Sequence, residues 1–192
     1  LEGLDAVRSR LEELAYLAQE ECMSFMPGGG QAPDTMAASQ PLDQQALERG
    51  VRIRSVYQDS FRNDAATLRY AQWLTSLGGE TRSSPTLPMP LIIIDRSVAL
   101  VPLDPNDPRR GALQVSSEGV VAGLCALFEQ VWESAIPFGE VRVDEHGLSP
   151  MEQALLRLLL EGRADEGAAR RLGISLRSVR RTMSSLMERL EA

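Results

Sequence analysis

The spacing of apolar residues changes several times along the first half of the chain. From Leu4 onward, apolar residues recur every three or four positions, which predicts an amphipathic helix ending near Glu21. A strand-like run follows at residues 22–26, then a Pro/Gly/Ser-rich loop and a short helix over residues 42–49 that ends at Gly50. The run "VRIRSVY" (residues 51–57) alternates apolar and polar side chains, as a strand with one buried face does.

Strands and helices continue to alternate up to residue 136. We expect a helix capped by Asn63 or Asp64 and stopped at Gly78, and a second helix over residues 118–135 capped by Ser116 or Ser117. Strands are expected at residues 80–82, on both sides of a turn at Asp95 and Arg96, and at residues 111–116. This alternation predicts an α/β domain over residues 1–136.

The remaining residues have a different character. Proline, glycine and charged residues predict a linker over residues 137–148, and no strand-like run follows it. Residues 149–192 divide into three helical segments with short breaks. Ser149, Pro150 and Glu152 form a capping-box pattern for the first, Asp165 is expected to cap the second, and Ser175 the third.

The third of these segments has two unlike faces. A turn of 100° per residue groups Val179, Met183, Leu186, Met187 and Leu190 on one face and Arg177, Arg180, Arg181 and Ser184 on the other. The spacing of Ala169, Gly173 and Val179 is typical of a helix-turn-helix, which needs a small residue at the helix contact, a glycine in the turn and a β-branched residue to lock the second helix.

These residues carry a family resemblance. The run "LSPMEQALLRLLLEGRADEGAARRLGISLRSVRRTMSSLMERL" resembles the LuxR-type DNA-binding domain over about 42 residues, without the fourth helix that usually completes that domain and assists its dimerisation. The resemblance implies that polar residues of the third helix face double-stranded DNA. The candidate base-facing and phosphate-facing residues are Arg177, Ser178, Arg180, Arg181, Thr182, Ser184, Arg170 and Arg171.

The distribution of charge favours the same hypothesis. The chain has a net charge of −7, yet residues 149–192 carry eight arginines against six acidic residues, while residues 1–148 carry 12 arginines against 21 acidic residues. Positive charge is therefore concentrated in the segment that the motif assigns to DNA.

The α/β segment raises the alternative of an enzyme. Phospholipase D-type phosphodiesterases carry a His-x-Lys-x(4)-Asp motif beside such a strand, but counting back from Asp95 places Pro88 and Pro90 at the histidine and lysine positions. The segment resembles the phospholipase D-like sensor domain of TrmB-like and LuxR-associated regulators. That resemblance implies a phospholipase D-like α/β domain, without catalysis, that senses a ligand or dimerises.

Other candidate sites have weaker support from the sequence. Arg54, Tyr57, Gln58, Arg82 and Asp95 lie at or near predicted strand ends, where α/β folds place ligands. The run "PGGGQ" (residues 27–31) lacks the Lys-Ser/Thr of a phosphate-binding loop, and His146 has no partner histidine or serine nucleophile near it in the sequence, so a flexible loop and an exposed side chain are the favoured interpretations.

Composition narrows the remaining possibilities. No apolar run approaches the roughly 20 residues of a membrane helix, and the N-terminus lacks the pattern of a signal peptide. We expect a cytoplasmic protein with Cys22 and Cys125 reduced, no metal site and no cofactor.

The sequence thus predicts a transcriptional regulator that binds DNA as a homodimer and responds to a small-molecule effector. Two alternatives stay open: a phosphodiesterase with an atypical nucleophile, and a dimerisation module whose helix-turn-helix does not bind DNA. The first residue, Leu1, also leaves open a further segment upstream.

Overall fold

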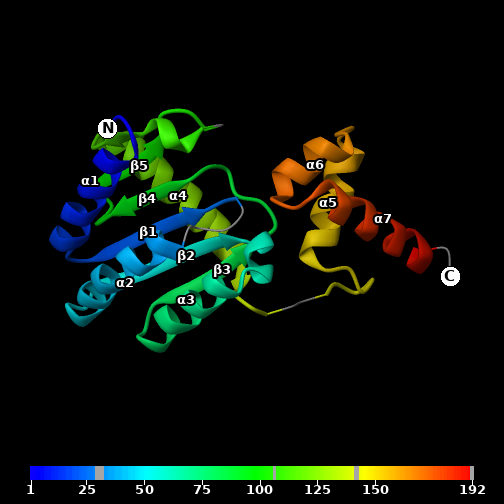
Figure 1. The fold of residues 1–192 in the computed structure, drawn as a ribbon, viewed down its shortest axis with the longest axis horizontal. Helices are drawn as coiled ribbons and strands as arrows, with labels where there is room; N and C mark the ends of the chain where they lie inside the picture. Colours follow the sequence, from blue (N-terminus) through cyan, green and yellow to red (C-terminus); the bar gives the residue numbers. More distant parts are fainter. Residues whose placement is uncertain (29–32, 106, 141–142, 191–192) are drawn as a thin grey trace.

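A twisted seven-stranded sheet organises the first 137 residues of the computed structural model, which describes residues 1–28, 33–105, 107–140 and 143–190 (Figure 1). The strand order is β6-β5-β4-β1-β2-β3-β7. The three neighbours β1, β2 and β3 are parallel, and the strands added at both edges pair antiparallel. The strands are β1 Glu21–Met26, β2 Arg52–Gln58, β3 Glu80–Ser84, β4 Leu91–Ile94, β5 Val98–Pro102, β6 Ala112–Val115 and β7 Ile136–Pro137.

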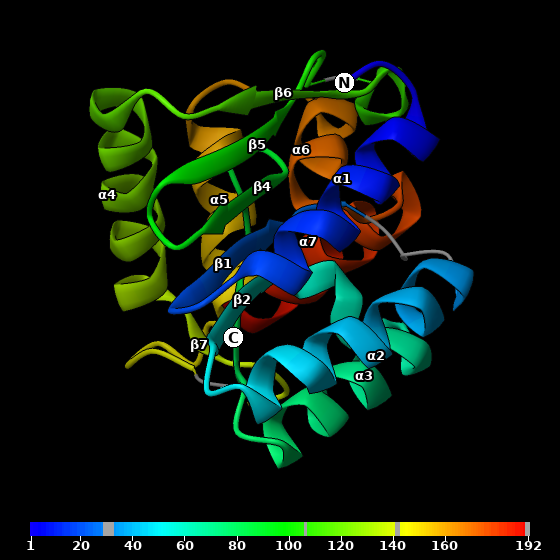
Figure 2. The same ribbon diagram turned by 90° about the vertical axis from the view of Figure 1, so that its left-hand side faces the viewer.

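Helices cover both faces of this sheet. Figure 2 shows α4 on one face and α1, α2 and α3 on the other. Their bounds are α1 Leu4–Leu17, α2 Pro33–Glu48, α3 Ala65–Ser76 and α4 Glu118–Ser134, with short 3-10 turns η1 Asp59–Asn63 and η2 Pro108–Arg110.

Alternation along the central strands separates two hydrophobic layers. Met23 and Phe25 of β1 face α4, where they pack with Phe128. Ile53 of β2 faces the other way and packs with Leu74 of α3. Because side chains on successive strand residues point to opposite faces, both sides of β1 and β2 are buried.

Three helices form a separate small domain beyond one end of the sheet: α5 Pro150–Leu160, α6 Asp165–Leu172 and α7 Leu176–Leu190 (Figure 1). Their shared core consists of Leu155, Leu158, Ala168, Ala169, Leu172 and Val179. The protein is therefore an α/β domain followed by a small all-α domain, as the sequence predicted.

Several local predictions are confirmed. Asp64 caps α3 by accepting a hydrogen bond from the Thr67 amide, and Ser149 and Glu152 form the expected reciprocal capping box of α5. Asp95 and Arg96 form the turn between β4 and β5, both with positive φ values (48° and 52°), as a tight hairpin turn requires.

Three other local predictions are wrong. Helix α1 ends at Leu17, because the Asp95 carboxylate accepts the amide hydrogens of Gln19, Glu20 and Glu21 and leads the chain into β1. The predicted loop before residue 42 is helical from Pro33 onward, and Pro41 lies inside that helix. Ala164, not Asp165, is the N-cap of α6.

The described part of the chain contains no helix that is long and apolar enough to cross a membrane. Residues 29–31 of the glycine-rich run lie outside the described residues.

Candidate nucleic-acid interface

Helices α6 and α7 meet with helix-turn-helix geometry. Ala169 of α6 and Val179 of α7 are buried at the helix contact. Gly173 ends α6 with a left-handed φ of 63°, and a Cβ atom there would lie 2.8 Å from the Ser60 hydroxyl. Glycine is therefore required both by the turn and by the neighbouring α/β domain.

The outward side of α7 carries the predicted polar face. Ser175 precedes the helix, and its hydroxyl accepts a hydrogen bond from the Ser178 amide at 3.1 Å. The exposed residues of this face are Arg177, Arg180, Arg181 and Ser184, while Ser178 and Thr182 are half-buried. Arg180 lies 3.5 Å from Asp165, and both side chains are exposed.

The apolar side of α7 agrees with the prediction only in part. Val179 and Leu186 are buried and Met183 is half-buried. Met187 is 57% exposed, which corrects its assignment to the core face. The side of this turn that faces α5 carries the buried Leu186 and Arg189, which donates to Glu152, and at 100° per residue Met187 points away from both. The side chain of Leu190 lies outside the described residues.

Helix α6 lies against the α/β domain rather than facing solvent on all sides. Arg170 and Arg171 line a cleft of about 500 Å³ between the two domains, together with Arg163. The Arg171 guanidinium donates a hydrogen bond to the Leu87 carbonyl at 3.2 Å. Contact between Arg171 and a DNA phosphate would require that bond to break.

Gln58, at the carboxyl end of β2, links the two domains directly. Its side-chain amide donates hydrogen bonds to the carbonyls of Arg171, at 2.7 Å, and Pro85, at 3.2 Å. Its side-chain oxygen accepts a hydrogen bond from the Gly28 amide at 2.8 Å. One side chain thus joins the carboxyl ends of β1 and β2 to the last turn of α6.

The same cleft contains the positions that a phospholipase D motif would use for catalysis. Pro88 and Pro90, which replace the histidine and lysine of that motif, both line it. Proline has neither a nucleophilic side-chain atom nor a charge that could hold phosphate. Three arginines from α6 and the preceding loop are the only cationic side chains that line this cleft among the described residues.

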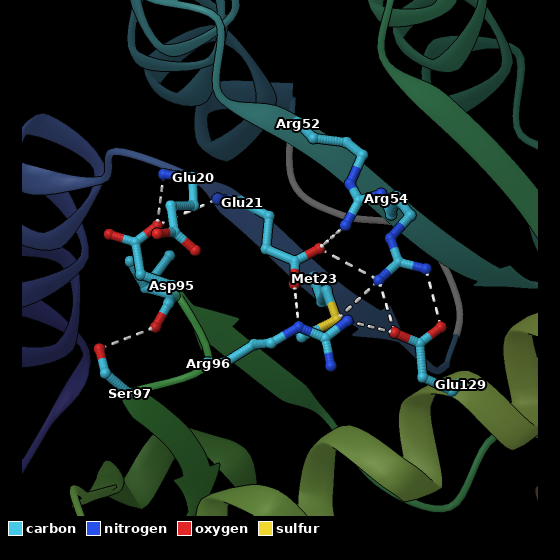
Figure 3. Close-up of polar contacts among 10 residues, drawn as sticks. Glu20, Glu21, Met23, Arg52, Arg54, Asp95, Arg96, Ser97 and Glu129 are labelled. Carbon is cyan, nitrogen blue, oxygen red and sulfur yellow. Dashed lines mark hydrogen bonds and ion pairs between the residues drawn. The ribbon is translucent and has the colours of Figure 1, made fainter.

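A cluster of charged side chains lies at the opposite end of the parallel strands (Figure 3). Glu21 of β1 accepts hydrogen bonds from Arg52, Arg54 and Arg96. Both terminal nitrogens of Arg54 also donate to Glu129 of α4, each at 2.8 Å.

Electrostatics hold this cluster ionised. The hydrogen bond from Arg54 lowers the pKa of Glu129 to about 2. Burial of Glu21 opposes its ionisation, but hydrogen bonds from Arg52 and Arg96 outweigh that effect and lower its pKa. The same hydrogen bond to Glu129 raises the pKa of Arg54. These contacts make the cluster a cross-link between α4 and the sheet.

The five predicted ligand residues do not form one site. Arg54 lies within β2, not at its end, and its guanidinium stacks over Phe128 and Trp132. Arg82 stacks on Trp132 and donates to its carbonyl, and Asp95 binds backbone amides. Gln58 joins the domains, and Tyr57 lines a cavity on the other face of the sheet.

Sequence reasoning missed the cluster and the link between the domains. The alternating run 51–57 predicted a strand with one buried face, which would leave Arg54 exposed; β2 is instead buried on both faces, because α4 covers the second face, and a buried arginine requires anionic partners. The sequence did not indicate Arg163 or the Gln58 contact either, since both depend on how the two domains meet.

One relative of known role resembles the chain in sequence. A bialaphos biosynthetic pathway regulatory protein of Streptomyces hygroscopicus is 32% identical over 146 residues. The alignment covers 76% of this chain and 57% of the relative, so the chain spans little more than half of the length of that protein. No family model matches the sequence.

Solved structures resemble the fold. The archaeal chromatin protein TrmBL2, described as showing a novel mode of DNA binding, has a TM-score of 0.53 at 20% identity, covering 71% of this chain and 52% of its own. NucT from Helicobacter pylori has a TM-score of 0.56 at 14% identity, covering 70% of this chain and 92% of its own. The phospholipase D family member Nuc from Salmonella typhimurium has a TM-score of 0.52 at 14% identity, covering 69% and 91%. Together these structures show that the α/β domain has the phospholipase D-like fold.

Proposed function

We propose that the protein is a DNA-binding transcriptional regulator. The observation that carries this proposal is the exposed arginine face of α7, the second helix of a helix-turn-helix. Arg177 and Arg181 have no ion-pair partner among the described residues, so their charge is available to an external anion. The regulatory role of the Streptomyces relative supports the proposal.

In this role, the polar face of α7 enters the major groove. Arginine forks bind the O6 and N7 atoms of guanine or clamp phosphates, which suits Arg177, Arg180 and Arg181. Hydroxyl groups of Ser178, Thr182 and Ser184 extend the same face and would bond base edges or backbone oxygens. The resemblance to LuxR-type domains supports this assignment.

The α/β domain would regulate the helix-turn-helix domain through the contact between Gln58 and α6. In the present arrangement Arg171 is bound to Leu87, and its carbonyl is bound by Gln58. A ligand that moves the end of β2 would release α6 and free Arg171 and Arg170 for phosphates. We therefore propose that the α/β domain senses a small molecule and then changes the position of the helix-turn-helix domain.

We further propose that two copies bind together on DNA. A single helix-turn-helix reads one half-site, and paired half-sites about one helical turn apart are typical of dimeric readers. Sedimentation of the protein on a DNA duplex with two half-sites should show two chains for each duplex, and one chain for each duplex would contradict the dimer.

Phospholipase D-type hydrolysis is not part of this proposal. Pro88 and Pro90 occupy the cleft where the motif would place its nucleophile and phosphate clamp. The full chain should leave bis(4-nitrophenyl) phosphate intact, and hydrolysis abolished by one substitution in the α/β domain would instead establish the phosphodiesterase alternative.

The central experiment compares two pairs of neighbouring exposed arginines. The variant Arg180→Ala/Arg181→Ala should lower affinity for duplex DNA at least about 30-fold and reduce the slope of log affinity against log salt by about 2, because each lost phosphate contact removes about 0.9. Fluorescence anisotropy with mixed-sequence duplexes, followed by selection of retained sequences, measures both.

The matched control is Arg109→Ala/Arg110→Ala, which removes the same charge from an exposed site of the α/β domain. Its affinity should stay within about twofold of the parent protein. Equal losses in both variants would show binding by overall charge alone, and unchanged affinity in the α7 variant would overturn the proposed interface.

A further inference from the structure

A partly enclosed cavity lies between the sheet and the helices α1, α2 and α3. It measures about 120 Å³ and lies on the face of the sheet opposite α4. We propose that this cavity binds a small organic amine, with the ammonium group at Asp43 and the hydrocarbon part against the sheet. This proposal names a ligand class for the sensing role proposed above; binding can be tested without DNA, and only the effect of the ligand on DNA rests on the DNA-binding role.

The polar end of the cavity converges on one carboxylate. Asp43 of α2 accepts a hydrogen bond from the Tyr70 hydroxyl of α3. Tyr57 of β2 lines the same end, beside a buried hydroxyl pair in which Ser24 donates to Ser55 at 2.9 Å. These groups offer oxygen acceptors to a donor that enters the cavity.

Apart from Ser39 of α2, the rest of the lining is apolar or weakly polar. Leu11 of α1, Leu74 of α3 and Ile92 of β4 are among the residues that surround the remaining space. An apolar cavity of about 150 Å³ can hold benzene, so this one suits a ligand of about five to seven non-hydrogen atoms. The cavity therefore has apolar walls and one polar end, which is the usual pattern of a small-molecule site.

The charge of Asp43 favours a cationic ligand group at the polar end of the cavity. No arginine or other cationic side chain lines the cavity, and Asp43 has no ion-pair partner among the described residues. Burial raises the pKa of Asp43 to about 6, although the hydrogen bond from Tyr70 opposes that rise. A bound ammonium would stabilise the carboxylate that burial now disfavours, whereas an anion would be repelled.

The cavity is also connected to the DNA-binding domain. Tyr57 lines it, and the next residue of β2, Gln58, holds the Arg171 carbonyl of α6. A ligand that displaces Tyr57 would therefore disturb the residue that joins the domains.

Isothermal titration of the full chain with n-butylamine, n-butanol and butyrate tests the site without DNA. The three probes share a four-carbon skeleton and differ in charge. We expect butylamine to bind at least about tenfold more tightly than butanol, because hydrogen bonds to charged groups are the stronger ones. Butyrate should not bind.

The affinity for butylamine should fall as the pH drops below about 6, because Asp43 then becomes protonated and neutral. The titratable groups facing Asp43 there are Tyr70 of α3, Tyr57 of β2 and Cys22 of β1.

The variant Asp43→Asn should lose at least about tenfold in butylamine affinity and keep its weak butanol affinity, which also shows that the cavity is intact. Asp5→Asn removes the same charge from an exposed position of α1 and should change neither the butylamine affinity nor the butanol affinity. Equal binding of amine and alcohol, retained amine affinity in Asp43→Asn, or no amine binding would each overturn the proposal. Because DNA is absent, none of these outcomes affects the proposed DNA interface.

Discussion

Arginines do two different jobs in this protein. At the start of the parallel strands, Arg54 is 6% exposed and is bound by Glu21 and Glu129 while it stacks on two aromatic rings. On α7, Arg177 and Arg181 are exposed and have no acidic partner among the described residues. The charge of Arg54 is neutralised within the protein, whereas we propose that the charges of Arg177 and Arg181 bind an external anion.

The difference shows that residue type alone does not assign function. A buried cation without anionic partners would cost too much free energy to keep, so Arg54 marks structure. An exposed cation contributes little to stability, so the α7 arginines can be replaced at little cost to the fold, as a binding role requires. Free-energy measurements on matched variants can separate the two roles.

The largest effect is expected at Arg54. Arg54→Met leaves Glu129 with a single cationic partner and removes the stacking on Phe128, which should lower the free energy of unfolding by about 3 kcal/mol. The neighbouring Arg52 is exposed, and its buried partner Glu21 keeps Arg54 and Arg96, so Arg52→Met should cost less than about 1 kcal/mol. Urea denaturation measures both, and similar losses would show that burial of Arg54 is unimportant.

Acid should weaken the same cluster. The pKa of Glu129 is held at about 2, below its ordinary value, so its contribution to stability is present above about pH 4.5 and is lost as the pH falls toward 2. Glu129→Gln should therefore show a shallower loss of stability between pH 5 and pH 2, in chemical denaturation at stepped pH. Glu133→Gln, exposed on the same helix, controls for net charge, and an unchanged slope in Glu129→Gln would contradict the cluster's role.

Arg181→Ala should separate binding from stability. The free energy of unfolding should stay within about 0.5 kcal/mol of the parent value, because the side chain is exposed and has no ion-pair partner in the part of the chain that the structure describes. The salt dependence of DNA binding should become shallower by about 0.9. A large loss of stability instead would place Arg181 with the structural arginines.

The smallest effect concerns Arg180, which is intermediate between the two groups. Asp165→Asn removes its exposed partner and one repulsive charge, so non-specific DNA affinity should rise by about twofold to threefold. Glu166→Gln, in the same first turn of α6, removes equal charge without touching that pair. An equal gain in both variants would mean that the pairing with Asp165 does not restrain Arg180.

Local sequence patterns predicted much of this molecule. The capping box of α5 and the glycine in the helix-turn-helix turn act between residues close in the chain, so their chemistry could be recognised in the sequence. The turn at Asp95 and Arg96 was found for the same reason. Helical periodicity predicted both faces of α7. The structure confirms that the arginine face is exposed, whereas Met187 of the predicted apolar face does not join the core.

Long-range contacts explain what was missed. The end of α1 depends on Asp95, a residue more than 70 positions away, whose carboxylate takes the amides of residues 19–21. The convergence of Asp43 and Tyr70 on one cavity depends on α2 and α3 packing side by side. No local period carries that information.

The sequence by itself determined that an α/β domain precedes a helix-turn-helix and that only the latter carries a net positive charge. Periodicity, caps and turn residues act within a few positions, so they can be deduced before folding. Only the tertiary structure decided which arginines are neutralised by buried carboxylates and which lie exposed on the surface, and that Gln58 joins the two domains. Those outcomes depend on side chains brought together from distant segments, and burial then determines whether each charge needs a partner.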